Sequence, residues 1–278
     1  MSAGFVTSRD GTRLAYLTAG DPALPPIVLI HGWAQYHGCW IDLMDLLADR
    51  HHLVAIDLRG HGASDKPEDE AAYTDTALWG DDVHAVIEDL GLIRPVLVGW
   101  SYGSRVIAAY LATHGNDDIA GVVLTGGILA IGSAREDWMV GTTSPGLDRD
   151  LYTEDTTRRL AATARFVEAC TTKPLSRQDF AAYVGANMLC PAHVRRALFA
   201  ANVDLKPAYG AMTCPGLVIH GTADTVVTPR TGEIAADLMQ RGRYLPYDGI
   251  GHAPFVEDPD RFESDLHAFA TSVTEPAA

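Results

Sequence analysis

Short apolar runs recur along the chain between glycines, prolines and aspartates, and stretches with helical spacing separate them. Solidly apolar runs of this length are typical of strands that helices cover on both faces. Near the N-terminus, FVTS and RLAYLTA flank Asp10-Gly11 and predict an antiparallel hairpin. The candidate buried strands are Ile27–Ile30, Leu53–Ile56, Val96–Gly99, Val122–Thr125, Leu217–His220 and Arg243–Tyr247.

The stretches between these runs predict helices. They cover Cys39–Ala48, Thr76–Leu90, Tyr102–His114, Gly232–Gln240 and Pro259–Ser272. The alternation of strands and helices predicts an α/β fold with a mostly parallel, eight-stranded sheet flanked by helices.

One connection breaks the regular spacing. Between VVLT and LVIH lie about ninety residues, far more than one crossover helix needs. We therefore expect residues 133–212 to form a helical cap, inserted after the sixth strand. Residues 1–132 and 213–278 would then form the core domain. The final TEPAA is expected to fray.

Composition narrows the classes of partner. The formal net charge is −15 without a basic patch, which argues against nucleic acid and anionic membranes as partners. The four cysteines lie far apart without a metal-binding pattern, so we expect them to be reduced and buried. Neither a signal-like start nor a membrane-length apolar run is present, and a cytoplasmic protein is expected. A small-molecule substrate is the expected partner, and a homodimer is left open.

The stretch LVGWSYGSRV carries candidate chemistry. Gly99-Trp100-Ser101-Tyr102-Gly103 is a G-x-S-x-G pattern between a predicted strand and a predicted helix. A sharp strand-to-helix turn brings neighbouring chain segments so close that only glycine fits beside the serine. The turn would expose the hydroxyl of Ser101 at the carboxyl edge of the sheet, and Ser101 is therefore the candidate nucleophile.

A serine nucleophile needs a base and a group that orients the base. His252 lies in the glycine-rich loop DGIGHAPF after the last strand, where its imidazole can reach the sheet edge. Asp224 follows the strand LVIH by four residues and is the candidate acid, whereas Asp248 is interpreted as a turn residue. The other histidines, His220 inside a strand among them, are interpreted as structural.

Further residues are expected around this site. The backbone N–H groups of Trp33 and Tyr102 are the candidate donors to a developing oxyanion. A substrate pocket is predicted from residues near the strand ends, most of them apolar or aromatic. These residues are Tyr36, His37, Trp100, Ile128, Leu129, Trp138, Met139, Val226 and Phe255.

Together, five segments of the chain resemble motifs of the α/β-hydrolase superfamily. They are His31-Gly32, DLRGHGASDKP, GWSYGS, HGTADTVV and GIGHAPFVEDP. The likeness covers nearly the whole chain except the cap, and it looks nearest to the serine esterases, perhydrolases and non-haem haloperoxidases. The resemblance implies the α/β-hydrolase fold, with Ser101 as nucleophile, His252 as base and Asp224 as its orienting acid. It also implies an oxyanion hole of the Trp33 and Tyr102 amides.

The expected function is a serine hydrolase with an acyl-enzyme on Ser101. It would cleave a small to medium hydrophobic carboxylic ester or lactone, and this chemistry requires no cofactor. Two alternatives stay open. One is a ligand receptor of the same fold with slow or no turnover. The other is a cofactor-independent dioxygenase, although His37 is displaced from the position that such enzymes use, where Gln35 stands.

Overall fold

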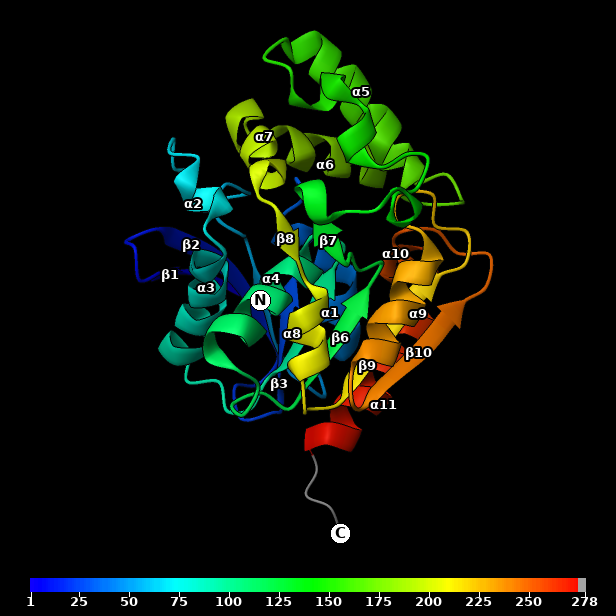
Figure 1. Cartoon of the computed structure of the whole chain (residues 1–278). Helices are drawn as coiled ribbons and strands as arrows, with labels where there is room; N and C mark the ends of the chain where they lie inside the picture. Colours follow the sequence, from blue (N-terminus) through cyan, green and yellow to red (C-terminus); the bar gives the residue numbers. More distant parts are fainter. Residues whose placement is uncertain (275–278) are drawn as a thin grey trace.

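The computed structural model describes residues 1–274, and an eight-stranded sheet forms the centre of this part of the chain (Figure 1). The strands follow the order β1-β2-β4-β3-β5-β6-β9-β10. The first two pair antiparallel with each other, β2 also pairs antiparallel with β4, and all other pairs are parallel. The strands are β1 (Ser2–Thr7), β2 (Arg13–Ala19), β3 (Pro26–Ile30), β4 (His52–Ile56), β5 (Val96–Trp100), β6 (Gly121–Thr125), β9 (Gly216–Gly221) and β10 (Gly242–Tyr247).

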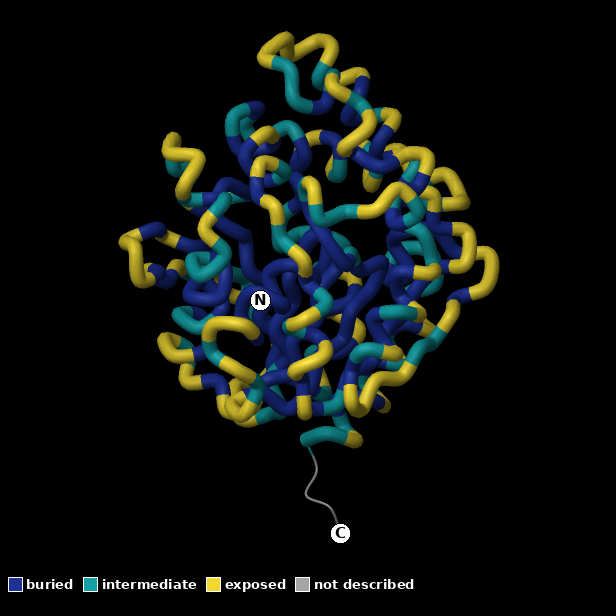
Figure 2. Tube along the Cα trace, viewed as in Figure 1, coloured by how far each residue is buried: buried dark blue, intermediate teal, exposed yellow. Residues whose placement is uncertain are grey.

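Helices cover both faces of the sheet because its central strands carry apolar side chains on both faces. On one face, β-strand residues pack with α1 and α11, and on the other with α3, α4 and α9. Figure 2 shows the resulting buried interior, with the exposed residues at the periphery. The helical segments of the core are η1 (His37–Trp40), α1 (Ile41–Leu47), α2 (Ala71–Thr74), α3 (Thr76–Asp89), α4 (Gly103–His114), α9 (Pro229–Leu238), α10 (Pro254–Glu257) and α11 (Pro259–Thr274).

The long connection after β6 forms a helical layer above the sheet (Figure 1). At its base Ala130 pairs with Asp204, and Ile131 with Val203. The final helix before β9 packs against α4 and α9 of the core. The segments are β7 (Ala130–Ile131), η2 (Gly132–Ala134), η3 (Asp137–Met139), η4 (Pro145–Leu147), η5 (Arg149–Tyr152), α5 (Thr156–Ala169), α6 (Arg177–Met188), α7 (Ala192–Ala200), β8 (Val203–Asp204) and α8 (Lys206–Ala211).

A buried arginine organises the upper part of this layer. The Arg195 side chain of α7 donates hydrogen bonds to the carbonyls of Leu151 and Cys190, at 3.1 and 3.0 Å, and to the side chain of Asn187 at 2.8 Å. Burial lowers the pKa of Arg195 to about 10. The guanidinium therefore ties η5, α6 and α7 together through carbonyl groups that would otherwise lack partners.

The structure confirms the predicted fold class and sheet. The hairpin and all six predicted buried strands are present. The ends of the buried strands differ from the prediction by at most one residue, whereas the first hairpin strand begins three residues earlier than predicted. Helices α7 and α8 lie within the predicted helical cap but were not predicted individually. The four cysteines are buried and unpaired. Apart from Thr274, the predicted frayed terminus lies outside the described residues. Within them, no helix has the length and apolar character needed to cross a bilayer.

Candidate active site

The candidate nucleophile lies in a strained turn between β5 and α4. Ser101 has a φ of 53°, a conformation that non-glycine residues seldom adopt. A Cβ at Gly99 would lie 2.8 Å from the backbone of Gly103, and one at Gly103 would lie 2.4 Å from the carbonyl oxygen of Ile30. Both glycines are therefore required by close approach of the backbone, as the G-x-S-x-G pattern predicted.

The candidate base and acid are joined by a short hydrogen bond. Nδ1 of His252 lies 2.7 Å from Oδ2 of Asp224, and both side chains are fully buried. Burial raises the pKa of the Asp224 carboxyl, but interactions with His252 and His220 outweigh burial and hold that pKa well below its usual range. An ionised carboxylate only accepts, so Nδ1 of His252 carries the proton and Nε2 is left free as a base.

Contacts on both sides of Ser101 place His252 beside the turn. The indole N–H of Trp100 donates to the carbonyl oxygen of His252 at 2.8 Å. The amide of Ser101 donates to Thr125 at 2.9 Å, and a Cβ on the following Gly126 would lie 2.9 Å from Nδ1 of His252. In the described part of the chain, Nε2 of His252 is buried without a hydrogen-bond partner. It is therefore available for a hydroxyl proton.

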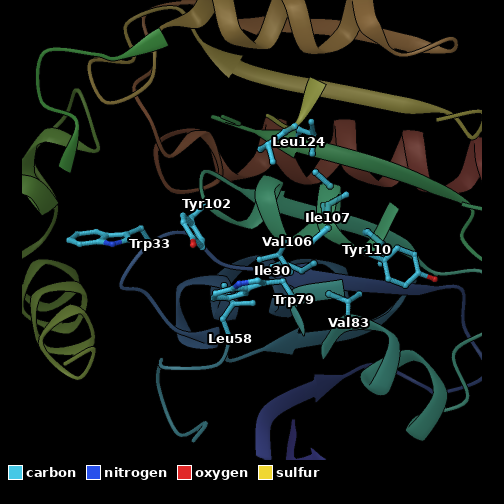
Figure 3. Close-up of a cluster of buried hydrophobic side chains, with 14 of the residues drawn as sticks. Ile30, Trp33, Leu58, Trp79, Val83, Tyr102, Val106, Ile107, Tyr110 and Leu124 are labelled. Carbon is cyan, nitrogen blue, oxygen red and sulfur yellow. The ribbon is translucent and has the colours of Figure 1, made fainter. Parts of the chain in front are cut away.

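The loop after β3 approaches the same turn. A Cβ at Gly32 would lie 3.2 Å from Cβ of Ser101. The backbone N–H groups of Trp33 and Tyr102 donate to no protein acceptor within residues 1–274. Figure 3 shows the Trp33 side chain at the end of a buried cluster, toward the cap, with Tyr102 nearby. Two unused amides beside a serine are suited to holding a developing oxyanion.

A network of buried polar groups fixes this loop. Ala34, with a φ of 54°, donates its N–H to Nε2 of His61 at 3.2 Å. The Asp57 carboxylate accepts from the amide and from Nδ1 of His37, at 2.6 and 2.9 Å. Burial raises the pKa of the Asp57 carboxyl, but bonding to His37 prevails and brings that pKa down to about 2. The segment DLRGHGAS is therefore a support for the loop.

A small cavity lies beside the candidate catalytic residues. Its volume is about 20 Å³, roughly the space of one water molecule. Two of its lining residues, Trp100 and Ala253, are sequence neighbours of Ser101 and His252. The lining residues are Gln35, Trp100, Val167, Cys170, Thr171, Leu175, Tyr183, Ala253 and Val256.

Most of the predicted substrate-binding side chains lie elsewhere. Among them, Trp100 alone lines this cavity in the described structure. Phe255 is buried between Trp40 and Trp100, with ring centroids 4.3 and 5.0 Å away, and so supports Trp100. Leu129, Met139 and Val226 are buried, whereas Tyr36, His37, Ile128 and Trp138 are partly exposed. Contact of these residues with a substrate stays a prediction.

One residue that contacts the candidate catalytic pair was not predicted from the sequence. His220 was interpreted as structural, but its Nε2 lies 3.0 Å from Oδ2 of Asp224. A fully buried polar side chain inside an apolar strand requires a hydrogen-bond partner, and this signal was available in the sequence. Asp248, in contrast, is a turn residue whose carboxylate accepts from the Thr222 hydroxyl at 3.1 Å.

Comparison with known proteins identifies the family of this fold and site. The family model described as alpha/beta hydrolase fold matches residues 25–259, a range that holds every candidate catalytic residue. The chain belongs to the α/β-hydrolase family. The match bears out the resemblance that the five sequence motifs indicated.

Known relatives narrow the class of reaction. The chain is 28% identical to the bifunctional esterase/perhydrolase DCH of Acinetobacter calcoaceticus, over 97% of this chain and the whole relative. The crystal structure of esterase RhEst1 from Rhodococcus sp. ECU1013 matches with a TM-score of 0.92 and 38% identity, covering 98% of this chain and 100% of that one. A putative aryl esterase from Burkholderia cenocepacia matches with a TM-score of 0.91 and 33% identity, covering 98% and 99%. These relatives support ester hydrolysis by this α/β hydrolase.

Proposed function

We propose that this α/β hydrolase cleaves small hydrophobic carboxylic esters or lactones through an acyl-enzyme on Ser101. The observation that carries the proposal is the pairing of His252 with Asp224 at 2.7 Å, beside a serine held at a φ of 53°. The unpartnered Nε2 of His252 gives this pair a free acceptor for the serine proton.

In the first step, Oγ of Ser101 attacks the ester carbonyl carbon while Nε2 of His252 takes the hydroxyl proton. The carbonyl oxygen becomes an oxyanion, which the amides of Trp33 and Tyr102 hold. When the tetrahedral intermediate collapses, the bond to the alkoxy oxygen breaks and His252 returns the proton to that oxygen. The alcohol leaves, and the acyl group stays on Ser101.

In the second step, water attacks the acyl-enzyme. His252 removes a proton from the water, the same two amides hold the second oxyanion, and the bond to Oγ breaks as His252 reprotonates the serine. The ionised Asp224 stabilises the imidazolium that forms in each step. Atoms balance with ester and water consumed and acid and alcohol released.

The tight space beside the site supports a small acyl group. The cavity between Trp100 and the residues Val167 and Tyr183 measures about 20 Å³, whereas pockets that bind drug-sized ligands measure about 300 Å³ or more. An acetyl or propionyl group is therefore expected to fit with the least rearrangement of the cap.

The test is steady-state hydrolysis of p-nitrophenyl esters from acetate to octanoate, together with labelling by a fluorophosphonate. The acetate or propionate ester should give the highest kcat/KM, and Ser101→Ala should lower it by at least about 10⁴-fold and abolish labelling. Ser133→Ala, at an exposed serine in the cap, is the matched control and should retain both.

Two outcomes would replace the proposal. A single burst of p-nitrophenol without turnover would indicate a ligand receptor with a residual nucleophile. Oxygen uptake that survives Ser101→Ala and is lost in His252→Ala would indicate a cofactor-independent dioxygenase.

A further inference from the structure

A second buried histidine touches the catalytic carboxylate. His220 is fully buried on β9, where it pairs in register with Pro246 of β10. Asp224 lies four residues later in the loop after the strand, and the mechanism proposed above gives His220 no task. A buried histidine at such a position requires an explanation for both of its ring nitrogens.

The Asp224 carboxylate has four donors around it. Oδ1 accepts from the amides of Val226 and Val227, at 2.8 and 3.0 Å. Oδ2 accepts from Nδ1 of His252 at 2.7 Å and from Nε2 of His220 at 3.0 Å. A carboxylate offers about four lone-pair positions, so all of them are in use. The two amides fix the plane of the carboxylate, and the two imidazoles share the oxygen that orients the base.

The surroundings of His220 determine which nitrogen carries its proton. Nε2 faces an ionised carboxylate, and the carbonyl of Val227 lies 3.3 Å away, so Nε2 must be the donor. Nδ1 is buried with no partner in residues 1–274, and a Cβ at Gly232 would lie 2.7 Å from it. Protonation of Nδ1 would leave a buried donor unpaired, so the neutral ring is favoured.

We propose that His220 is a positioning residue, which acts on His252 by holding Oδ2 of Asp224 in place and by taking up part of its negative charge. The proposal rests on the function proposed above for its kinetic consequence, but the geometry of the pair does not depend on that function. Because His220 draws charge away from the side of Oδ2 that faces His252, it makes the imidazolium of His252 easier to deprotonate. The base is then in its reactive form at lower pH.

Few other titratable groups face this cluster. Cys170 at the end of α5 lies against the His252 loop, where its carbonyl accepts from the amide of Ala253 at 3.1 Å. Glu257 of α10 accepts from the amide of Gly251 at 2.7 Å, and Tyr244 of β10 lies beside Gly232. Burial raises the pKa of the Cys170 thiol, so this group remains neutral across the range of the test.

The kinetic test compares His220→Phe with His220→Gln. Phenylalanine keeps the bulk but removes the donor, whereas the glutamine amide nitrogen reaches about as far as Nε2. In His220→Phe we expect kcat for p-nitrophenyl acetate to fall about tenfold with KM unchanged, and the acidic limb of kcat/KM to move up by about half a pH unit or more. His220→Gln should recover most of both effects. His267 lies on α11 and pairs with His51, away from this cluster. His267→Phe is therefore the control and should change neither kcat nor the acidic limb.

Gly232→Ala provides a second variant that leaves every catalytic side chain in place. Its new Cβ would press on Nδ1 of His220, so we expect a shift of the acidic limb in the same direction as in His220→Phe. If the acidic limb of kcat/KM lies at the same pH in both variants as in the unmodified enzyme, the proposal is wrong.

The pair can also be observed without hydrolysis. In Ser101→Ala protein, ¹⁵N NMR of the imidazole rings should show His220 protonated at Nε2 and bare at Nδ1, and the titration midpoint of His252 should rise in His220→Phe. If the unmodified protein hydrolyses no ester although these signals appear in Ser101→Ala protein, the proposed function fails and the positioning role stands. A proton on Nδ1 of His220, or a His252 midpoint that does not move, overturns the positioning role.

Discussion

Different kinds of contact hold the core and the predicted cap of this hydrolase. In the core, the Asp224 carboxylate is saturated by amides and imidazoles, and the Ser101 turn is fixed by backbone contacts that exclude any Cβ at two positions. The segment 133–212, predicted to be a cap, contributes one strand of a short two-stranded ribbon, and a buried guanidinium links η5, α6 and α7 within it. Its charge also differs, because it holds ten of the 21 basic residues but only nine of the 36 acidic ones.

From this difference we expect changes in the two regions to affect catalysis and the choice of substrate separately. The core leaves almost no freedom at the reacting atoms, so changes there should affect kcat. The cap lines the cavity through Val167 and Tyr183 and carries basic side chains toward solvent, so changes there should affect KM and the preferred ester. Four changes test this division, two in each region.

The largest effect is expected from Asp224→Asn. The amide would keep the shape but offer an N–H where Oδ2 accepts two imidazole donors, so His252 would turn or take the wrong tautomer. We expect kcat to fall about 10⁴-fold with little change in KM. Steady-state kinetics with p-nitrophenyl acetate measures this, and far-UV circular dichroism controls for folding. A decrease in kcat of less than tenfold would show that Asp224 does not orient the base.

A second effect concerns the pH dependence of core stability. Burial lowers the pKa of His31 to about 4 and that of His61 to about 3. The pKa of a histidine in the unfolded chain is about 6.5. Below that pH the unfolded chain binds a proton at each of these rings and the folded chain does not. The stability of the folded state is therefore full above about pH 6.5 and is lost as the pH falls toward about 4. The loss is about 2 kcal/mol for each ring at about pH 5 and about 3 kcal/mol at about pH 4. Urea unfolding at pH 7.5 and 5 measures it.

His61→Gln should make that pH dependence shallower, because one of the two rings that resist protonation is gone. His84→Gln, at a partly exposed histidine on α3, is the matched control and should leave the slope unchanged. Equal slopes in the unmodified protein and His61→Gln would contradict the assignment of the pH effect to the loop behind Trp33.

The cap should respond to Arg195→Met. The variant leaves the carbonyls of Leu151 and Cys190 without their donor, at a cost of about 3 kcal/mol. Limited proteolysis should cut residues 133–212 at least tenfold faster, and KM should rise more than kcat falls. Arg158→Met, at an exposed arginine of α5, is the control. Cleavage of the core at the same rate as the cap would show that the two unfold together.

The smallest effect is expected at the cap surface. A cleft of about 500 Å³ is lined by Arg135, Arg149 and Arg196 and by no carboxylate. Arg135→Gln combined with Arg149→Gln should raise KM two- to fivefold for an ester with a free carboxylate, at low salt only, because exposed charges contribute less than about 1 kcal/mol. The butyrate ester, which carries no charge, is the control for the substrate. Arg177→Gln, at an arginine outside this cleft, is the control for the position of the charge. An equal change for both esters would assign the effect to packing.

The same division explains what the sequence could predict. Gly99 and Gly103 predicted the turn at Ser101 because backbone contact there admits one residue type, and the loop position of His252 and Asp224 follows from the edge where parallel strands end. The partner of His220 was missed, because one buried histidine in a strand does not say which loop covers it. Apart from Trp100, the lining of the cavity was not predicted, because its residues on α5 and α6 meet the core through contacts between segments that are distant in the sequence.

The pairing of Ala130 with Asp204 and of Ile131 with Val203 affects how the sequence between these strands can change during evolution. Residues 132–202 therefore leave and re-enter the core at adjacent positions, so a change in the length of this segment need not shift the strands beneath. A replacement segment would still have to supply the contacts with the catalytic loops, where the amide of Gly141 donates to Val226 and the carbonyl of Cys170 accepts from Ala253, both at 3.1 Å.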